Sequence, residues 1–414
     1  MVDILGNAIP NADTAFDTPD LGEIDFEVNG RRYTTALSYN YEESYLSPSD
    51  RWSVSFDQDE LSEEDLTALV PRASMSLSIN GHPQTTGYID SIHTSTSNGT
   101  IVTISGRDWL SPAVDAHISP RTRFNPSQTL LDVVNTAFEP FGITAIATDN
   151  VANANTINGQ IYGNQVSKKG KPLKSYGLHE LKPYNNESAF AFCSRISQRF
   201  GLWIRPSATK GILLVTAPNY DREAPYGLVH KQNGAASLGN NILSSDVTLD
   251  AADQPSVIVA SGFNGGGSFS YAGMTSAIVN PIISTDYSRT SNEYPNVKFT
   301  VGTDPQTTQF NNFDDPYARP LFLYDSESHT IDQLNAFLRR QLSLCLRKAF
   351  NAHYVIEGHQ IGGVPIAVDT MMSVDDDRSN VHQDLWVLSR KFTKSSNGGT
   401  HTSVELILPG ALSF

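Results

Sequence analysis

A repeated residue pair, Asn-Gly, limits the fold of this chain more than any other feature. In the first hundred residues it stands at residues 29–30, 80–81 and 98–99, each time between short segments that alternate apolar and polar residues. Both residues accept the positive φ angles of a tight hairpin turn, and a period of two is typical of strands with one buried face. In WSVSF, residues 52–56, every second residue is apolar. The pattern therefore predicts a mainly β protein with antiparallel sheet.

Residues 20–107 are predicted to form a first tube-like antiparallel β-barrel domain with one short helix. The helix lies in LSEEDLTALV, where Ser62 can cap it and the acidic residues that follow favour the positive end of its dipole. Residues 1–19 lack strand periodicity and are predicted to be a flexible N-terminal segment. They have no basic region followed by a long apolar run, so they do not resemble a signal peptide.

Residues 108–235 are predicted to form a small α+β middle domain. The segment NPSQTLLDVVNTAFEPFG has the pattern of a helix opened by Asn125-Pro126, and NESAFAFCSRISQRFG that of a second helix ending at Gly201. LWIRPSATKGILLVTAP then has the pattern of a β-hairpin. Residues 149–182 are rich in Asn, Gly and Lys, and we predict that they form an exposed inserted loop.

Residues 236–414 return to strand periodicity and are predicted to form a second tube-like β domain, with elaborated loops over residues 265–325 and a long helix over residues 330–350. One apolar stripe runs along this helix. The stripe consists of Ile331, Leu334, Leu338, Leu342, Cys345 and Ala349. We expect it to pack against the second β domain.

The composition narrows the function. The formal net charge is −15, from 29 basic and 44 acidic residues, which argues against a protein that reads DNA sequence. The charge fits either ordinary solubility or an acidic surface that repels a passing polyanion, and both remain open. The two cysteines, Cys193 and Cys345, lie on helix-like apolar stretches and suggest no disulfide framework, so we infer assembly in a reducing cytoplasm. No stretch approaches the roughly 20 apolar residues of a membrane-spanning helix, so no membrane insertion is expected.

Two segments resemble catalytic or metal motifs only in part. Ser207 and Lys210 fit S-x-x-K, but they lie between two predicted strands and the partner motifs of that enzyme class are absent, so a β-turn is predicted. Asp375, Asp377 and Ser379 are spaced like the start of a calcium loop. The positions that require Gly and Glu hold Asn380 and Trp386 instead, so the loop fails as a calcium site.

The remaining candidates also favour structural roles. The glycines at 265–267 precede no lysine and no helix, so they are predicted to form a loop. His353 and His359 flank one strand without a third ligand at useful spacing. The one basic cluster, Lys168, Lys169, Lys171 and Lys174, is predicted to be a solvated loop or a contact to an acidic neighbour. We therefore predict no catalytic residues, no metal ligands and no cofactor.

Two segments of the chain resemble each other. Residues 87–106, GYIDSIHTSTSNGTIVTISG, and residues 385–410, LWVLSRKFTKSSNGGTHTSVELILPG, each carry an aromatic, an aliphatic, a serine two residues on, a Ser-Asn-Gly turn and a returning strand. Any two hairpins with this turn look alike, and a duplicated β domain is the other interpretation. A trimer of a chain with two like domains would form a ring with pseudo-sixfold symmetry.

The order of short motifs resembles a known family, the Mu-like tail P proteins of contractile-tailed phages. The motifs are VNG at residues 28–30, GYID at residues 87–90, and Gly106-Arg107 followed by AVD at residues 113–115. The helix-turn segments of the middle domain and the ending VELILPGALSF are also similar to the family. The resemblance covers residues 24–414, except for residues 149–182 and 265–325.

This resemblance implies a structural, non-enzymatic baseplate hub of a contractile phage tail or related injection system. The expected assembly is a homotrimeric ring that joins the hexameric tail tube above to the trimeric central spike below, contacts neighbouring baseplate proteins, and leaves a channel through which DNA only passes. The expected location is the tail baseplate of the virion, after assembly in the host cytoplasm. The alternatives are a tail-tip cell-wall hydrolase, which would need convergent carboxylates or a metal, and a glycan-binding module, which would need exposed aromatic side chains.

Overall fold

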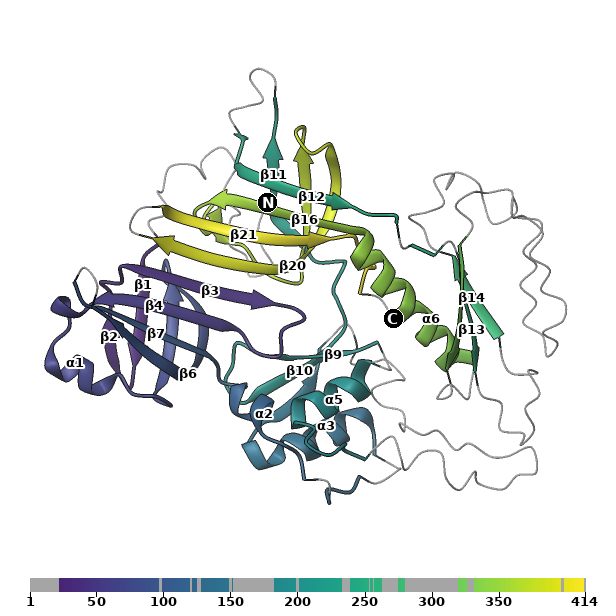
Figure 1. Ribbon diagram of the computed structural model, residues 1–414, viewed down its shortest axis with the longest axis horizontal. Helices are drawn as coiled ribbons and strands as arrows, with labels where there is room; N and C mark the ends of the chain where they lie inside the picture. The colour runs from purple at the N-terminus through teal and green to yellow at the C-terminus, as the bar shows by residue number, and fades with distance from the viewer. Residues whose placement is uncertain are drawn as a thin grey trace, which may run out of the picture. The chain divides into compact units, whose positions relative to one another are not determined.

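The structure is a computed structural model that describes residues 22–96, 99–119, 121–124, 128–148, 151, 182–198, 201–232, 239–252, 254–255, 257–262, 275–279, 319–325, 331–395 and 398–412. These residues are mostly β with few helices, as the sequence predicts (Figure 1). They form two compact units. One unit draws its described residues from 1–194, 204–246 and 352–406, and the other from 195–203, 247–351 and 407–414.

The largest sheet has thirteen strands. They are β1 (Ile24–Val28), β2 (Arg31–Tyr33), β3 (Ser38–Ser44), β4 (Arg51–Asp57), β5 (Ser74–Ile79), β6 (His82–Ser95), β7 (Ile101–Asp108), β11 (Glu223–His230), β12 (Ile242–Leu249), β16 (Phe350–Glu357), β19 (Met371–Asp376), β20 (Val381–Ser395) and β21 (Gly399–Ile407). The order is β12-β16-β21-β20-β3-β4-β7-β6-β5-β1-β2, and β19 and β11 branch from β20.

Smaller elements accompany this sheet. The middle region contains β8 (Thr144–Ala147), β9 (Trp203–Pro206) and β10 (Ile212–Thr216) in one three-stranded sheet, with α2 (Ser111–Asp115), α3 (Leu130–Phe138), η3 (Glu139–Phe141) and α5 (Ala189–Ser197). A second three-stranded sheet holds β13 (Val257–Gly262), β14 (Thr275–Val279) and β15 (Pro320–Asp325), next to α6 (Ile331–Ala349). The others are η2 (Gln58–Glu60), α1 (Glu63–Ala68), β17 (Gln360–Ile361) and β18 (Val364–Pro365).

Two predicted hairpin turns have the expected backbone. Asn29 and Gly30 have φ angles of 50° and 83°, and Asn80 and Gly81 have 50° and 77°. Positive φ at both central residues matches the twist of the strands that the turn joins. The turns connect β1 to β2 and β5 to β6, so both predictions are confirmed. Asn98 of the third pair lies outside the described residues.

Local signals also explain where helices begin and end. Ser62 caps α1 as predicted, and its hydroxyl oxygen accepts from the Asp65 N–H while the Asp65 carboxylate accepts from Ser62. A second such capping box at Thr129 starts α3 at Leu130, whereas the predicted opening at residues 125–126 lies outside the described part of the chain. Gly201 follows α5 with a φ of 71°, as a helix stop requires.

The two similar segments form two equivalent hairpins, β6–β7 and β20–β21. The first half of β6 pairs with β5 and its second half with β7, and the first half of β20 pairs with β19 before β3 takes over. Ahead of each hairpin a residue with positive φ, Arg72 at 70° or Asp369 at 65°, donates its N–H to the long strand, at Ile89 O or Val387 O. Such matching backbone detail favours a duplicated β domain over a chance likeness of two turns.

The two repeats lie in one continuous sheet. β3 pairs with β4 of its own repeat and with β20 of the other, so it joins them (Figure 1). The sequence predicts two closed tube-like barrels, but the strand order among the described residues is an open path. Closed barrels and the predicted domain boundaries at 107 and 235 therefore stay predictions.

The long helix confirms its predicted span and much of its stripe. Leu334 and Leu338 are buried in one cluster with Ile258 and Ala260 of β13, and Leu342 and Cys345 pack against that cluster. The stripe thus covers the small sheet of β13, β14 and β15. The apolar core of this small sheet is shared with the helix, because Ile258 and Ala260 of β13 are buried together with Leu334 and Leu338.

Replacing Leu338 by Asp should therefore destabilise this unit by more than about 3 kcal/mol, because it buries an unpaired charge where the side chain is 1% exposed. Urea unfolding followed by circular dichroism measures the loss. Leu344→Asp on the same helix is the matched control, since Leu344 is 40% exposed and should change stability little. Equal stability of Leu338→Asp and the wild type would contradict the described packing.

Candidate functional site

Two of the motif glycines, Gly87 and Gly106, lie where the paired strands β6 and β7 approach each other closely. A Cβ atom on Gly87 of β6 would lie 2.0 Å from the Arg107 carbonyl oxygen, and one on Gly106 of β7 would lie 2.0 Å from the Tyr88 carbonyl oxygen. Real Cβ atoms do not approach backbone that closely, so any larger residue would push β6 and β7 apart. Gly87 and Gly106 therefore serve the pairing of β6 with β7.

The charged residues of the same motifs meet in one cluster. Arg107 Nε donates to Asp90 Oδ2 at 2.7 Å, and its Nη1 and Nη2 donate to the two oxygens of Asp115 at 2.8 and 2.6 Å. Hydrogen bonds from Arg107 hold the pKa of Asp115 below its usual value. This bidentate arrangement ties α2 to the β6–β7 hairpin. Motifs that are 25 residues apart in sequence, at Asp90 and Asp115, thus act as one structural clamp.

A buried ion pair stands at the junction of the two repeats. Arg390 of β20 is 8% exposed, and its Nε donates to Glu43 Oε2 of β3 at 2.8 Å. The same guanidinium donates to Gln84 Oε1 at 3.0 Å and to the Ile366 carbonyl, and it lies 4.6 Å from the ring centre of Phe392. Every side of this cation thus has a partner, which a buried charge requires.

A second arginine completes the junction. Arg205, just before the β9–β10 turn, donates to Glu43 Oε1 at 3.0 Å and lies 4.5 Å from the Tyr45 ring centre. Burial by itself would raise the pKa of Glu43, but Arg390 and Arg205 outweigh it and hold that pKa below its usual value. The carboxylate is therefore charged at neutral pH, and it joins β3, β20 and the middle region.

Next to this network lie two carboxyl groups with raised pKa values. Burial raises the pKa of Asp50 well above its ordinary value, and the nearby charges of Glu43 and Asp108 add to it. Tyr41 Oη donates to Asp50 Oδ2 at 3.1 Å, while Asp108 accepts from Ser49 Oγ at 2.5 Å. A raised carboxyl pKa is one mark of catalytic acids. Here the groups stabilise a chain turn instead, since Asp108 also accepts from the backbone N–H groups of Asp50 and Leu110.

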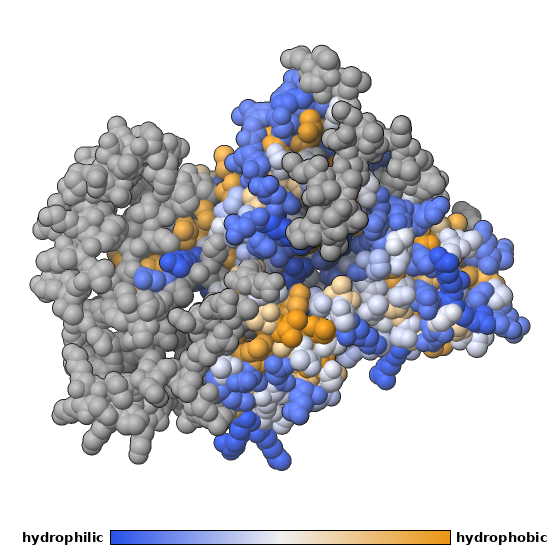
Figure 2. All heavy atoms as spheres, turned by 180° about the vertical axis from the view of Figure 1, so that it is seen from behind, coloured by the Kyte–Doolittle hydropathy of each residue, from blue (hydrophilic) through white to orange (hydrophobic). Residues whose placement is uncertain are grey.

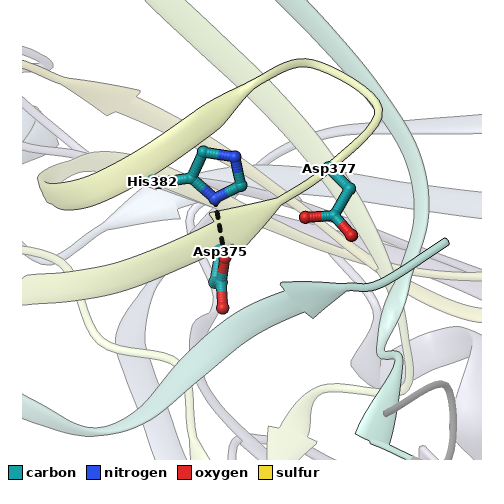
Figure 3. Close-up of side chains that lie close together, drawn as sticks. All are labelled: Asp375, Asp377 and His382. Atoms are coloured by element: carbon teal, nitrogen blue, oxygen red, sulfur yellow. Dashed lines mark hydrogen bonds and ion pairs between the residues drawn. The ribbon is translucent and has the colours of Figure 1, made fainter. Parts of the chain in front are cut away.

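The strongest metal-like cluster gathers Asp375, Asp377 and His382, whose ligand atoms all lie within 4.8 Å of one another (Figure 3). His382 Nδ1 lies 2.7 Å from Asp375 Oδ1. The Lys231 ammonium bonds to Asp375 and lies 3.2 Å from Asp377 Oδ1, so a cation of the protein already offsets part of the charge of the two carboxylates. Hydrogen bonding to Lys231 holds the pKa of Asp375 below its usual value. The cluster therefore closes β11 onto the β19–β20 turn.

The residues that the structure brings together in this segment differ from those of the calcium-like spacing. Ser379, the third residue of the calcium-like spacing, points elsewhere and donates to Asp376 Oδ2 at 2.5 Å. His382 takes its place beside the two aspartates because antiparallel pairing puts it opposite Asp375. The strand register places His382 there, and the spacing of the aspartates alone does not reveal that register.

Other sequence candidates have structural roles. Ser207 and Lys210 lie in the predicted turn between β9 and β10, where Ser207 Oγ accepts from the Thr209 N–H at 3.1 Å. His359 is buried, with its ring nitrogens 2.9 Å from Tyr39 Oη and 2.9 Å from Thr402 Oγ1. His353 Nδ1 lies 3.2 Å from the Val404 carbonyl. The four lysines at 168–174 and the glycines at 265–267 lie outside the described residues.

The two alternative functions would need exposed aromatic side chains or convergent carboxylates. Three of the four tryptophans, Trp52, Trp109 and Trp386, are buried, whereas Tyr184, Phe322 and Tyr324 are 58%, 61% and 63% exposed. Among the coloured residues of the face in Figure 2, hydrophilic side chains predominate and apolar side chains lie in smaller groups. A shallow hollow beside α3 carries two carboxylates, but Asp132 is held by Thr129 in the helix cap. No helix among the described residues has the length and apolar character needed to span a membrane.

The junction ion pair gives a direct stability prediction. Arg390→Met should destabilise the protein by about 3 kcal/mol or more, because it leaves the Glu43 charge buried with one partner fewer. The double variant Arg390→Met with Glu43→Gln should recover part of that loss. Urea unfolding of both variants measures the coupling, and Lys391→Met, at the next position of β20, is the control. Losses that simply add up would contradict the described pair.

Asp50 gives a prediction about the pH dependence of stability, in which a substitution stabilises the protein at neutral pH. Because its folded pKa is raised, wild-type stability carries a penalty above that pKa, and the penalty disappears as the pH falls below it. Asp50→Asn, which can still accept from Tyr41, should therefore gain about 1 kcal/mol at pH 7 and nothing at low pH. Thermal unfolding across pH measures the difference, with the exposed Asp384→Asn as control. A loss of stability at pH 7 would show that the Asp50 charge is needed.

Comparison with known proteins places this geometry in context. No protein-family profile and no curated protein matches the sequence. Solved structures do match. The 43 kDa tail protein of prophage MuSo2 from Shewanella oneidensis superposes with a TM-score of 0.66 at 17% identity, over 94% of this chain and 100% of that one.

Two further solved structures are similar. The tail protein from Neisseria meningitidis MC58 has a TM-score of 0.66 at 18% identity, over 94% of this chain and 97% of that one. The E. coli protein c3393, a type VI secretion component described as similar to the T4 phage tail proteins gp27 and gp5, has a TM-score of 0.50 at 8% identity, over 92% and 76%. The chain therefore has the fold of prophage tail proteins, in agreement with the Mu-like tail family that its motifs resemble.

Proposed function

We propose that this protein is the structural hub at the centre of a contractile-tail baseplate, in a phage or a related injection system. The observation that carries the proposal is the sheet of two equivalent repeats joined through β3, in a chain with the fold of prophage tail proteins. A protein whose central feature is a repeated sheet and a set of structural ion pairs is suited to assembly more than to catalysis.

Duplication explains how such a hub can join parts of different symmetry. Three copies of a chain with two like repeats present six similar units around a ring. A homotrimer can thus bind a hexameric tail tube ring on one side and a trimeric central spike on the other, with other baseplate proteins around it. In this arrangement the two repeats of each chain line the ring.

The charge of the chain suits a channel that conducts DNA without holding it. A protein that binds phosphate groups does so through clustered Lys and Arg, and its affinity falls steeply with salt. This chain carries a net charge of −15, so a neutral to acidic channel wall would repel a polyanion and let it slide. The protein would act in the virion baseplate, after assembly in the host cytoplasm, with no chemistry of its own.

The test is the mass of the purified chain in solution by mass photometry, with DNA binding measured on the same sample. We expect a trimer, and no salt-sensitive binding of double-stranded DNA. A stable monomer or an even-numbered oligomer would contradict the ring, and salt-sensitive DNA binding would contradict the acidic channel. Clearing of a peptidoglycan suspension would favour the cell-wall hydrolase instead.

A further inference from the structure

The two repeats differ in one respect: the same strand edge is covered in one and open in the other. In the second repeat, residues 389–394 of β20 pair with β3 of the first repeat. In the first repeat, β6 pairs with β5 as far as Tyr88 and with β7 as far as Ser95. Beyond Ile89, the β5 side of β6 therefore has no partner strand among the described residues, and most side chains from Asp90 to Ser95 are exposed.

The equivalence of β6 and β20 can be fixed residue by residue. Ile89 corresponds to Val387, because the two residues make the same backbone hydrogen bonds. The carbonyl oxygen of each accepts from a residue with positive φ, Arg72 or Asp369. The N–H of each donates to the carbonyl oxygen of the residue that follows, Ala73 or Thr370. Ser91 corresponds to Ser389 by the same difference of 298 in number. Ser91 Oγ bonds to Ser105 Oγ at 2.8 Å on β7, and Ser389 Oγ bonds to Glu405 Oε2 at 3.1 Å on β21.

The strand that corresponds to β3 is β12. Both are the first strand in a four-strand order, β3-β4-β7-β6 and β12-β16-β21-β20. β4 and β16 correspond with a difference of 300, since Val54 pairs with Ile104 as Tyr354 pairs with Val404. The Asp250 N–H donates to Ala349 O, so Asp250 lies opposite Ala349, which corresponds to Ser49 by the difference of 300. The register of β3 and β4, continued to Ser49, places Ser44 opposite it. Asp250 therefore corresponds to Ser44, and Leu249 corresponds to Glu43. β12 has β16 as its single partner among the described strands.

We propose that β12 of one copy of this chain pairs antiparallel with residues 90–95 of β6 in a second copy, as β3 pairs with β20 within one copy. This inference rests on the proposed trimer and names the strands that join its subunits. The occupant of both open edges is then the same chain, and each junction between copies repeats the junction inside a copy. Such head-to-tail contacts close into a ring when the rotation between copies allows it.

The register of the internal junction predicts which side chains meet. Arg390 stands opposite Glu43 there, so Ile92 of β6 should stand opposite Leu249 of β12. An apolar pair would thus replace the ion pair at the subunit junction. Leu249 is 71% exposed in the single chain, the highest value among its large exposed apolar side chains. An exposed edge strand with apolar side chains is a template for pairing with another chain.

The pairing also avoids electrostatic conflict. The same register places His93 opposite Thr248 and Ser95 opposite Asp246, and Ser91 opposite Asp250. No two like charges stand opposite each other, which would oppose pairing. Asp90 points its carboxylate to Arg107 within its own chain, so it needs no partner across the junction.

Disulfide cross-linking tests the register directly. In the internal junction the Tyr45 N–H donates to Leu388 O, which makes Lys391 and Glu42 a non-hydrogen-bonded pair with close Cβ atoms. The matching pair between copies is His93 and Thr248. The double variant His93→Cys with Thr248→Cys should therefore oxidise to a covalent trimer that reduction dissolves. Thr94→Cys with Thr248→Cys, whose side chains face opposite sides of the sheet, should cross-link at least tenfold less.

Two controls separate this inference from the proposed trimer. Lys391→Cys with Glu42→Cys should form a disulfide within one chain and show that oxidation works. Single-cysteine variants report any contribution of Cys345, which is partly exposed. A trimer that stays uncrosslinked through residues 93 and 248, while the internal pair links, overturns the strand junction and leaves the hub intact. A protein that remains monomeric contradicts both.

A surface substitution gives an independent readout. Leu249→Asp should raise the concentration needed for half-assembly at least tenfold, because it removes the apolar contact to Ile92, and it should leave the unfolding midpoint of the monomer unchanged. Val70→Asp is the matched control, since Val70 is 46% exposed and belongs to neither edge. Equal assembly of the Leu249→Asp and Val70→Asp variants would overturn the proposed junction.

Discussion

The buried pair of Arg390 and Glu43 holds together the part of the structure on which the rest depends, the junction between β20 and β3. Without this junction the thirteen-strand sheet would divide into two separate sheets, one from each repeat. Arg390 reaches from the second repeat to the first, and Arg205 brings the β9–β10 turn to the same carboxylate. Two cations on one buried carboxylate favour one register of β3 on β20, because a slip of one residue would leave the buried charge without its partners.

This junction leaves two strand edges open among the described residues, one on β12 and one on residues 90–95 of β6. Each repeat offers one edge on its first strand and one on its long last strand. The internal junction satisfies one pair of these edges and leaves the other pair, on β12 and β6, for a second molecule. A ring built from such units needs no new type of contact between subunits, which is how a duplicated chain can serve parts of sixfold and threefold symmetry.

Much of the local structure could be predicted from sequence, because local rules decide it. The Asn-Gly turns, the Ser62 cap, the stop at Gly201 and the span of α6 all follow from residues within one or two turns of chain. The start of α3 at Leu130 is also decided locally, by the capping box of Thr129 and Asp132, which the prediction from Asn125-Pro126 did not use. The internal resemblance of two hairpins was also visible, although it left chance and duplication both open.

The pairing of distant strands could not be predicted. Periodicity tells which face of a strand is buried, and it does not tell that β3 meets β20 some 350 residues later or that β11 runs parallel to β19. The same limit applies to side-chain clusters. The Asp90–Arg107–Asp115 clamp uses motif residues, yet His382 lies beside Asp375 through strand register alone. The Lys231 that bonds to this cluster follows the end of another strand.

Hydrogen exchange followed by mass spectrometry tests most directly whether the open edges are completed by another copy. Amides on the free edges of β12 and of residues 90–95 should exchange quickly in dissociated chains and slowly in the assembled protein. Amides of β3, which already lie between two strands, should be slow in both states. Slow exchange of β3 with no change at either open edge on assembly would show that the subunits meet elsewhere and would contradict this account.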